Sequence, residues 1–466
     1  MATVGPSTRE PERLRSLIEA GADVLRLNFA HPSPDVHRAA AEEARVQAEA
    51  AGRIVGILAD LPGPKMRTGD VSGDYIALET GQPFTLFGHD HLGEKGGVST
   101  TIETLATMVT EGDEIFLADG AIILKVTGIA GGDVTTEVVR RGILRARKGM
   151  HLPGAESHIE AFTEDDREAL EFALRFKIDL VGLSFIKDAE DIERARAALP
   201  KRGPKPLLVA KIETRSAIDR LEEVVQAADA VMVARGDLGI QCPFEEVPLL
   251  QKNIIALCNS TGTPVITATQ MLESMTQNPL PSRAEVNDVA NAVLDGTDAL
   301  MLSEETAVGK FPINTVRTMA KIAERAESDL RNEINKVHHG GEEDPVSWAI
   351  ARAAVHAAED LKVSAIICPT RSGATARRVA AFRPSMPILG LAHSPETVRP
   401  LSLVWGVVPG LSPFLPEEQL ASEGLRQAVD SARDAGLVGP GDLVAVVAGG
   451  PAPRAGSTDV MRIVMV

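Results

Sequence analysis

Cysteine and aromatic residues are scarce in this chain. Its 466 residues include three cysteines (Cys242, Cys258 and Cys368), and none of them belongs to a CxxC pair. This usage is typical of a reducing compartment with buried, unreactive thiols, so we expect a cytoplasmic protein. Aromatic residues make up 3% of the chain, which leaves few platforms on which nucleic-acid bases could stack.

Long apolar runs and a basic face are also missing. No run of about 18 uncharged apolar residues occurs, so we expect no membrane span. The N-terminus lacks a basic region followed by an apolar stretch, which argues against a signal peptide. The formal net charge is −17, and because binding to a phosphate backbone needs a basic face, we expect no nucleic-acid partner.

The dominant pattern is an alternation of short apolar strands with helix-period segments. A chain of 466 residues exceeds the size of one growing core, so we expect two or three domains. Alternating strands and helices predict a parallel α/β sheet, and eight of them predict a TIM (β/α)8 barrel. Seven strands are predicted at 24–29, 54–60, 180–185, 207–213, 230–237, 264–270 and 299–304, with an eighth at 2–4.

Two stretches break this alternation. Residues 69–150 are rich in glycine and show only strand-like runs, which predicts a small inserted β-barrel domain acting as a lid. From residue 336 to 466 a separate strand and helix series predicts a C-terminal open α/β domain. The barrel is therefore expected to be discontinuous, formed by residues 1–68 and 151–335.

Polar residues gather at the carboxyl ends of the predicted barrel strands. In such barrels these ends form the active-site face. A single charged strand end is usually only solvated, but a set drawn from seven strands favours a functional site. The set comprises Arg26, Asn28, Asp60, Ser184, Lys211, Glu213, Arg235, Asp237, Thr269 and Ser303.

Lys211, Glu213 and Asp237 are the central candidates. Side chains two residues apart on a strand point the same way, so Lys211 and Glu213 share one side, and Asp237 closes the next strand. Two carboxylates completed by waters and a substrate oxygen are a common way to hold Mg²⁺, and Lys211 would stabilise charge on a transferring group. Gly236 would let the backbone approach a carboxylate or phosphate. An ordinary intrastrand ion pair between Lys211 and Glu213 is the simpler alternative.

Several familiar motifs are absent. There is no GxxxxGK[ST] loop, no strand-linked GxGxxG, no paired His/Cys cluster and no support for a Ser-His-Asp arrangement. The residues themselves therefore predict a Mg²⁺-dependent barrel enzyme that acts on an anionic substrate.

Longer motifs resemble the pyruvate kinase family across nearly the whole chain. They include Arg26-Leu-Asn-Phe-Ala-His31, Lys211-Ile-Glu213 and Met232-Val-Ala-Arg-Gly-Asp-Leu-Gly239. The most specific is the block at 267–309, which begins Thr267-Ala-Thr-Gln-Met-Leu-Glu-Ser-Met275. The resemblance implies transfer of the phosphoryl group of phosphoenolpyruvate to ADP, giving pyruvate and ATP in glycolysis.

Site roles follow from the resemblance, motif by motif. Glu213 and Asp237 would bind Mg²⁺, with Mn²⁺ as an alternative, while Lys211 and Arg26 would contact the phosphoryl group. Transfer of this kind depends mainly on positioning and charge neutralisation. The substrate carboxylate would lie at Gly236, Asp237 and Thr269, the proton route would use Thr269 and Ser303, and the nucleotide side would comprise Asn28, His31, Arg67 and Lys148.

The monovalent-cation region departs from many family members. Those members bind K⁺ through an Asn, a Ser, an Asp and a Thr. Here Asn28 and Asp60 remain, but Ala30 and Leu61 replace the other two ligands, and Lys65 stands where a Glu is usual. A fixed ammonium can replace a mobile cation electrostatically. We therefore hypothesise a potassium-independent, Lys-type subgroup in which K⁺ is not required. A plain surface lysine is the alternative.

Further expectations rest on the resemblance. The loop Thr370-Arg-Ser372-Gly373-Ala-Thr375 joins a strand to a helix and would hold the phosphate of a small-molecule effector, which would make the C-terminal domain regulatory. A plain βα turn is the alternative. A homotetramer is also expected. Two other functions stay open: another Mg²⁺-dependent barrel enzyme on phosphoenolpyruvate or a 2-oxo acid, and a catalytically idle paralogue that binds effectors.

Overall fold

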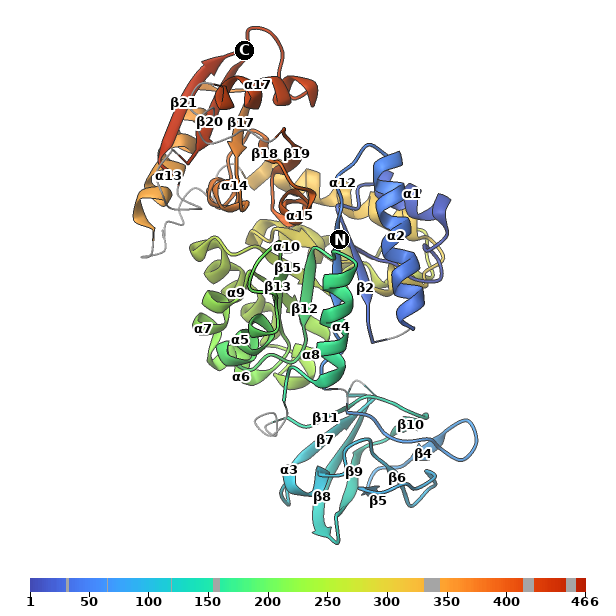
Figure 1. Cartoon of the computed structure of the whole chain (residues 1–466). Coiled ribbons are helices and arrows are strands. Elements are labelled where there is room, and N and C mark those ends of the chain that lie inside the picture. Colours follow the sequence, from blue (N-terminus) through green and yellow to red (C-terminus); the bar gives the residue numbers. More distant parts are fainter. Residues whose placement is uncertain are drawn as a thin grey trace.

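A closed parallel barrel forms the centre of the molecule (Figure 1). This computed structural model describes residues 1–30, 33–64, 66–118, 120–153, 160–330, 344–413, 423–449 and 458–466. Every neighbouring pair of strands in the barrel sheet is parallel. The predicted α/β fold class with a TIM barrel is confirmed. In sheet order the strands are β1 (Ala2–Thr3), β2 (Val24–Asn28), β3 (Gly56–Asp60), β12 (Leu180–Leu183), β13 (Leu207–Ile212), β14 (Ala230–Ala234), β15 (Val265–Ala268) and β16 (Ala299–Leu300).

The first strand closes the barrel although it is only two residues long. The backbone N–H of Thr3 donates to Leu302 O at 3.0 Å, and the N–H of Leu302 donates to Met1 O at 3.0 Å. The Thr3 hydroxyl adds a further bond to Leu302 O at 2.8 Å. These bonds pair the first barrel strand with the segment that follows the last one.

Helices surround the barrel, as the alternating pattern predicted. Strands such as β3 and β14 are buried at every position, because helices cover the outside and side chains fill the interior. Within β3, Ile57 belongs to the core between the strands and the surrounding helices, which we call the outer core. Leu58 belongs to the inner core, which fills the inside of the barrel. The helices are α1 (Pro11–Glu19), α2 (Pro34–Ala50), α4 (Glu164–Arg175), α5 (Ala189–Ala197), α6 (Arg215–Asp219), α7 (Leu221–Ala227), α8 (Arg235–Gln241), α9 (Val247–Thr261), η2 (Glu273–Thr276), α10 (Arg283–Asp295), α11 (Glu304–Ala307) and α12 (Pro312–Leu330).

The inserted segment forms an all-β unit with one short helix. Its six-stranded sheet has the order β11, β7, β8, β9, β5, β6, and β10 pairs with β4 in a second sheet. A separate cluster of buried side chains, which includes Phe84, Leu86 and Leu124, forms its core. The elements are β4 (Ile76–Leu78), β5 (Pro83–Phe87), β6 (Gly97–Ser99), α3 (Leu105–Met108), β7 (Glu114–Leu117), β8 (Ile122–Ala130), β9 (Asp133–Arg140), β10 (Gly142–Leu144) and β11 (Met150–His151).

The C-terminal segment forms a five-stranded sheet in the order β19, β18, β17, β20, β21, in which β21 alone is antiparallel to its neighbour. Strands β19 and β21 were not predicted from the sequence. The elements are α13 (Pro345–Leu361), β17 (Ala365–Pro369), α14 (Ala374–Ala380), β18 (Ile388–Ala392), α15 (Pro395–Val398), η4 (Arg399–Leu403), β19 (Val407–Leu411), α17 (Gly424–Asp434), β20 (Leu443–Ala448) and β21 (Val460–Met465).

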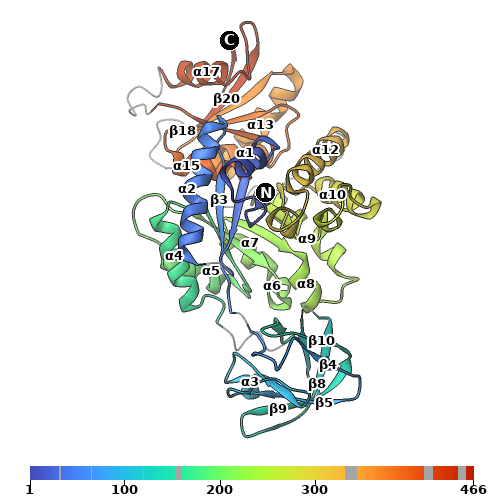
Figure 2. The same ribbon diagram turned by 90° about the vertical axis from the view of Figure 1, so that its right-hand side faces the viewer.

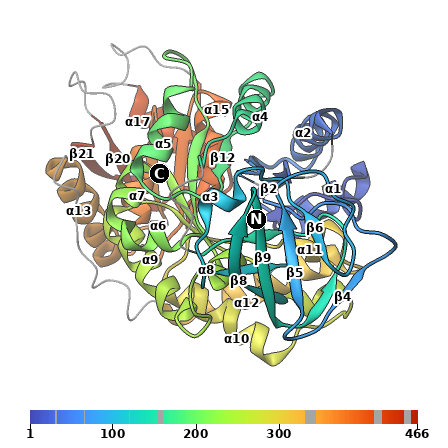
Figure 3. The ribbon, with the colours of Figure 1, turned by 90° about the horizontal axis from the view of Figure 1, so that it is seen from below.

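The inserted and C-terminal units lie at opposite ends of the barrel (Figures 1 and 2). The inserted unit follows the carboxyl end of β3, and Figure 3, seen from below, shows strands β5, β8 and β9 in front of helices that surround the barrel. At the other end, the Ser402 hydroxyl of η4 donates to Ile54 O at 3.1 Å, and Leu403 packs into the inner core of the barrel. Within the described ranges, no helix combines the length and apolar character needed to cross a bilayer.

Candidate active site

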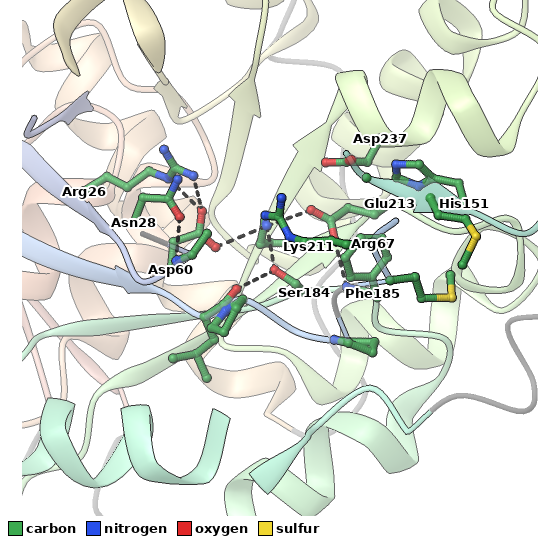
Figure 4. A pocket seen from close by; sticks show the side chains of 17 residues that line it. Arg26, Asn28, Asp60, Arg67, His151, Ser184, Phe185, Lys211, Glu213 and Asp237 are labelled. Atoms are coloured by element: carbon green, nitrogen blue, oxygen red, sulfur yellow. Dashed lines mark hydrogen bonds and ion pairs between the residues drawn. The ribbon is translucent and has the colours of Figure 1, made fainter. Parts of the chain in front are cut away.

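A pocket of about 210 Å³ lies where the carboxyl ends of the barrel strands face the inserted unit. Charged side chains from four different barrel segments converge on it (Figure 4). Arg67 and His151 reach it from the two connections to the inserted unit. The converging charged residues are Arg26, Asp60, Lys211, Glu213 and Asp237.

The Lys211 ammonium is held among three oxygens. Its Nζ donates a hydrogen bond to Ser184 Oγ at 2.7 Å. It also forms ion pairs with Glu213 Oε1 at 2.7 Å and Asp60 Oδ1 at 3.1 Å. Burial alone would lower the pKa of Lys211, but the carboxylates of Asp60, Glu213 and Asp237 raise it above its usual value. The group is therefore a permanent cation.

Asp60 joins this cation to a second one. Its Oδ2 accepts from Arg26 Nε at 2.7 Å, and the guanidinium NH2 lies 2.6 Å from the same oxygen. Arg26 also donates to Thr3 Oγ1 at 3.0 Å. Burial would raise the pKa of Asp60, but Lys211 and Arg26 lower it below its usual value. Asp60 is thus an anion that fixes two cations facing the pocket.

Glu213 and Asp237 form an acidic pair next to Lys211. Burial raises the pKa of Glu213 to about 7, the Lys211 ammonium opposes that shift, and the Asp237 carboxylate adds to it. Glu213 Oε2 accepts from the backbone N–H of Phe185 at 2.7 Å, which directs the other oxygen inward. A buried carboxylate and a half-buried one side by side are chemically suited to a divalent cation.

A bound Mg²⁺ would need further ligands. Within the described part of the chain, no group of three or more His, Cys, Asp and Glu could hold a metal ion by itself. Mg²⁺ usually keeps several waters and is held through one or two carboxylates together with substrate phosphates. Glu213 and Asp237 therefore fit an ion shared with an anionic substrate.

Gly236 and Thr269 come together beside this pair. The N–H of Gly236, in the first turn of α8, donates to Thr269 Oγ1 at 2.9 Å. Thr269 itself has a left-handed backbone with φ of 67°, an uncommon state for a β-branched residue that a functional site can maintain. The hydroxyl of Ser303 is buried without a hydrogen-bond partner among the described residues.

Three of the four residues predicted for the nucleotide side lie in the described part of the chain. Asn28 lies in the pocket wall, and its Oδ1 accepts from Ala30 N at 3.0 Å. Arg67 also lines the pocket and donates to Arg147 O at 2.9 Å. Lys148 is exposed between β10 and β11, and its N–H donates to Thr68 Oγ1 at 3.1 Å. His31 lies outside the described residues.

The monovalent-cation region keeps its two predicted oxygen-bearing residues in the pocket wall. Asn28 and Asp60 line the pocket, together with the Ala30 and Leu61 replacements. Lys65, the proposed substitute for K⁺, lies outside the described residues.

The candidate effector loop connects β17 to α14. Gly373 has a φ of 81° and its N–H donates to Thr370 Oγ1 at 2.9 Å, which shapes a tight turn. Ser372 is exposed. The hydroxyl of Thr375 lies 2.9 Å from that of Thr458 in the interior of the domain, so it is directed away from the loop surface.

Some residues near the pocket were not among the predicted site residues. Phe185 has a left-handed backbone with φ of 55°, which presents its N–H to Glu213, and an alternating strand pattern carries no signal for such a turn. His151 lines the pocket from β11. Ser184 was recognised only as a polar strand end, although it contacts Lys211 directly. Arg235 was also in that set, but it pairs with Asp288 at 2.7 Å and braces α10.

A barrel whose strand ends hold a permanent cation between buried carboxylates is suited to stabilising charge on an anionic substrate. These features define a (β/α)8 enzyme that binds a phosphate or carboxylate. The class alone does not select a reaction.

Comparison with known proteins selects the reaction. The chain matches the family model "Pyruvate kinase, barrel domain" over residues 1–316 and "Pyruvate kinase, alpha/beta domain" over residues 348–464. A Mycobacterium tuberculosis pyruvate kinase is 40% identical over 464 residues, which cover 99% of this chain and 97% of that protein. One from Sporosarcina psychrophila is 40% identical over 471 residues, covering 99% and 79%.

A solved structure agrees with these matches. A pyruvate kinase from Cryptosporidium parvum superposes with a TM-score of 0.90 at 33% identity and covers 100% of this chain and 95% of that one. The chain belongs to the pyruvate kinase family. It is a phosphotransferase that transfers the phosphoryl group of phosphoenolpyruvate to ADP, giving pyruvate and ATP.

Proposed function

We propose that phosphoryl transfer takes place in the pocket around Lys211, with Glu213 and Asp237 as the metal-binding carboxylates. The observation that supports this most is the burial of one ammonium against Glu213 Oε1 at 2.7 Å and Asp60 Oδ1 at 3.1 Å. A fixed cation in a water-poor site neutralises charge on a phosphoryl group in flight without reorganising.

Glu213 and Asp237 would hold Mg²⁺, which the family generally needs, or Mn²⁺. The bound ion would supply charge neutralisation at the phosphate oxygens. Glu213 is prepared for this role because its backbone contact with Phe185, at 2.7 Å, fixes the carboxylate plane. Occupation would also favour the ionised form of a carboxyl group whose pKa burial raises to about 7.

Arg26 and Lys211 would bind the phosphoryl group of phosphoenolpyruvate from two sides. Both cations are fixed by Asp60, so their spacing is set before the substrate arrives. The substrate carboxylate would lie against Gly236, Asp237 and Thr269, where backbone N–H groups of the first turn of α8 favour an anion.

The enolate left after transfer must gain a proton. We assign this route to Thr269 and Ser303. The Ser303 hydroxyl is buried and has no partner among the described residues, so it is available to a water or to the substrate. Asn28, His31, Arg67 and Lys148 would contact ADP. Arg67 lies in the first connection to the inserted unit, and Lys148 lies within that unit, between β10 and β11.

The test is pyruvate release from phosphoenolpyruvate and ADP, coupled to lactate dehydrogenase. Lys211→Met should abolish turnover while phosphoenolpyruvate still binds, as measured by calorimetry in Mg²⁺. Lys205→Met, which changes an exposed lysine before the same strand, is the matched control and should retain activity. Unchanged turnover in Lys211→Met would contradict the assignment.

We also propose that the enzyme belongs to a Lys-type subgroup that does not require K⁺. The support is the substitution pattern: Ala30 and Leu61 line the pocket at positions where a cation site would need oxygen ligands, and Lys65 follows in the same loop. Rates should be equal in K⁺ and in tetramethylammonium at matched ionic strength. A large loss of rate without K⁺ would refute this assignment.

The remaining proposals concern the wider molecule. We retain domain limits of 1–68 with 151–335, 69–150 and 336–466, a cytoplasmic location and a homotetrameric assembly. We also retain an effector site at the loop 370–375, for which Thr370, Ser372 and Gly373 offer polar groups at the start of α14. Sedimentation velocity tests the tetramer. Sugar phosphates and nucleoside monophosphates added to the coupled assay test the effector site.

A further inference from the structure

Ser184 makes two hydrogen bonds that lie in series. It follows β12 directly, and its side chain is buried within the pocket wall (Figure 4). Its hydroxyl donates to the backbone oxygen of Leu61 at 2.7 Å and accepts from Lys211 Nζ at 2.7 Å. A hydroxyl has one proton to donate. Because Ser184 donates it to the carbonyl oxygen of Leu61, a lone pair of Oγ is left to accept from the ammonium.

The other two contacts of Lys211 are less directional. Asp60 Oδ1 and Glu213 Oε1 pair with the ammonium at 3.1 Å and 2.7 Å, and the charge attraction that dominates such a pair depends on distance more than on direction. In the proposed function Glu213 is also a metal ligand, so its hold on the ammonium competes with that role. Ser184 is neutral and has no such competing role. The hydrogen bond to Ser184 is therefore suited to setting the direction of the ammonium.

Ser184 is in turn held by the segment 61–64. The N–H of Leu61 donates to Gly182 O at 3.0 Å, and that of Gly63 donates to Asp166 Oδ1 at 3.0 Å. Gly63 packs so closely that an added Cβ would lie 2.8 Å from the Cβ of Ser184. This segment leads from β3 towards the first connection of the inserted unit, so Leu61, Ser184 and Lys211 form a continuous path from that connection to the ammonium.

We propose that Ser184 is a positioning residue for phosphoryl transfer, which aims the Lys211 ammonium and ties its position to the segment 61–64. The inference rests on the proposed role of Lys211. Ser184 does not contact the substrate in this scheme. It acts through Lys211, so its loss should impair the transfer step more than the binding of either substrate.

Ser184→Ala tests the proposal directly. The variant loses the hydrogen bond to the Lys211 ammonium, and we expect this loss to lower kcat by about 10- to 100-fold. The KM for phosphoenolpyruvate should stay within about twofold, because Arg26 and the paired ammonium remain in the pocket. An unchanged kcat would overturn the proposal.

Thr297→Val is the matched control. The Thr297 hydroxyl also accepts one buried hydrogen bond, from Thr267 Oγ1 at 3.0 Å, and donates another, to Val265 O at 3.0 Å. It lies before β16, at the opposite end of the barrel from the pocket. Thr297→Val should lower the melting temperature about as much as Ser184→Ala and leave kcat unchanged. Equal kcat losses in the two variants would reduce Ser184 to a structural role and overturn the proposal.

A second variant guards against a folding failure. Ser184→Cys keeps a small side chain with a weak donor and acceptor, so its kcat should lie between those of the native enzyme and Ser184→Ala, again at nearly constant KM. A native kcat in a folded Ser184→Cys protein would count against the proposal. If Lys211→Met stays active, the proposed function fails. If Lys211→Met is inactive and Ser184→Ala is fully active, only the role of Ser184 fails.

Discussion

Replacing Asp60 with Asn should destabilise the barrel and disturb both cations of the pocket. The Asp60 side chain accepts from Arg26 at 2.7 Å through Oδ2 and pairs with Lys211 at 3.1 Å through Oδ1. An asparagine has one acceptor oxygen and one donor NH₂ group. The asparagine oxygen can face only one of the two cations. The other cation would then face the NH₂ group, which is also a donor, in a buried site.

The magnitude follows from the burial of the pair. The Asp60 side chain is 2% exposed and the Arg26 side chain 12%, so water cannot replace the lost anion. Breaking a buried ion pair by removing one partner costs about 3–5 kcal/mol. For a domain of this size we expect the melting temperature to fall by on the order of 10 °C.

The pH dependence of this effect has a defined sign. Burial would raise the pKa of Asp60, but Lys211 and Arg26 hold it below its usual value. A carboxyl group with a depressed native pKa stabilises the fold above its unfolded pKa of about 3.9, and that stabilisation is lost as the pH falls through the native pKa. The stability gap between native protein and Asp60→Asn should therefore be constant above about pH 5 and narrow below about pH 4.

Scanning calorimetry and circular dichroism measure this gap. Asp35→Asn is the matched control, because Asp35 forms a pair with Arg38 at 3.3 Å but its side chain is 87% exposed. Such exposed pairs contribute roughly 0–1 kcal/mol, so the control should melt close to the native protein. Equal melting temperatures for native protein and Asp60→Asn at pH 7 would refute the reasoning.

Two further predictions concern the rest of the chain. Arg383 joins the C-terminal unit to the barrel by pairing with Asp298 at 3.0 Å, and within its own unit it lies over the Trp405 ring at 5.0 Å. Arg383→Lys keeps the charge but loses the planar fork, so calorimetry should show the C-terminal unit unfolding at lower temperature; an unchanged trace would contradict this. Burial raises the pKa of the Cys258 and Cys368 thiols, so a disulfide reagent at pH 8 should label them only after unfolding in urea. Rapid labelling of native protein would contradict their burial.

The barrel and the centre of the site were predictable because they depend on local pattern. Strands covered on both faces need near-continuous apolar runs, and β3, β12, β14 and β15 have them, with Asp60 and Thr267 as the polar exceptions. The two-residue period of a strand placed Lys211 and Glu213 side by side, as their 2.7 Å contact shows. This contact is the ion pair that the sequence offered as the simpler alternative, and the catalytic role of the two residues stays a proposal.

Other features depend on parts of the chain that are distant in sequence. Strand β19 contains a proline and a glycine and is partly exposed, so its composition gives no clear strand signal. Arg235 stands at a strand end like Lys211, but it forms an ion pair with Asp288, which is distant in the sequence. Ser184 donates its hydrogen bond to Leu61, 123 residues away, and the role proposed for Ser184 depends on that contact. A residue type identifies what a side chain can bind, while its partner is decided by the folded arrangement.

The most direct test of the active-site assignment is the rate of pyruvate formation in Glu213→Gln as Mg²⁺ is titrated. Glutamine preserves the size of the side chain and an acceptor for the Phe185 N–H, which Glu213 now contacts at 2.7 Å, but removes the charge that would hold the ion. Glu245→Gln, an exposed glutamate outside the pocket, is the control. We expect Glu213→Gln to lower kcat/KM by a factor on the order of 1,000 and to need more Mg²⁺ for half-maximal rate. A native rate with a native Mg²⁺ requirement would contradict the assignment of Lys211, Glu213 and Asp237 as the phosphoryl-transfer centre.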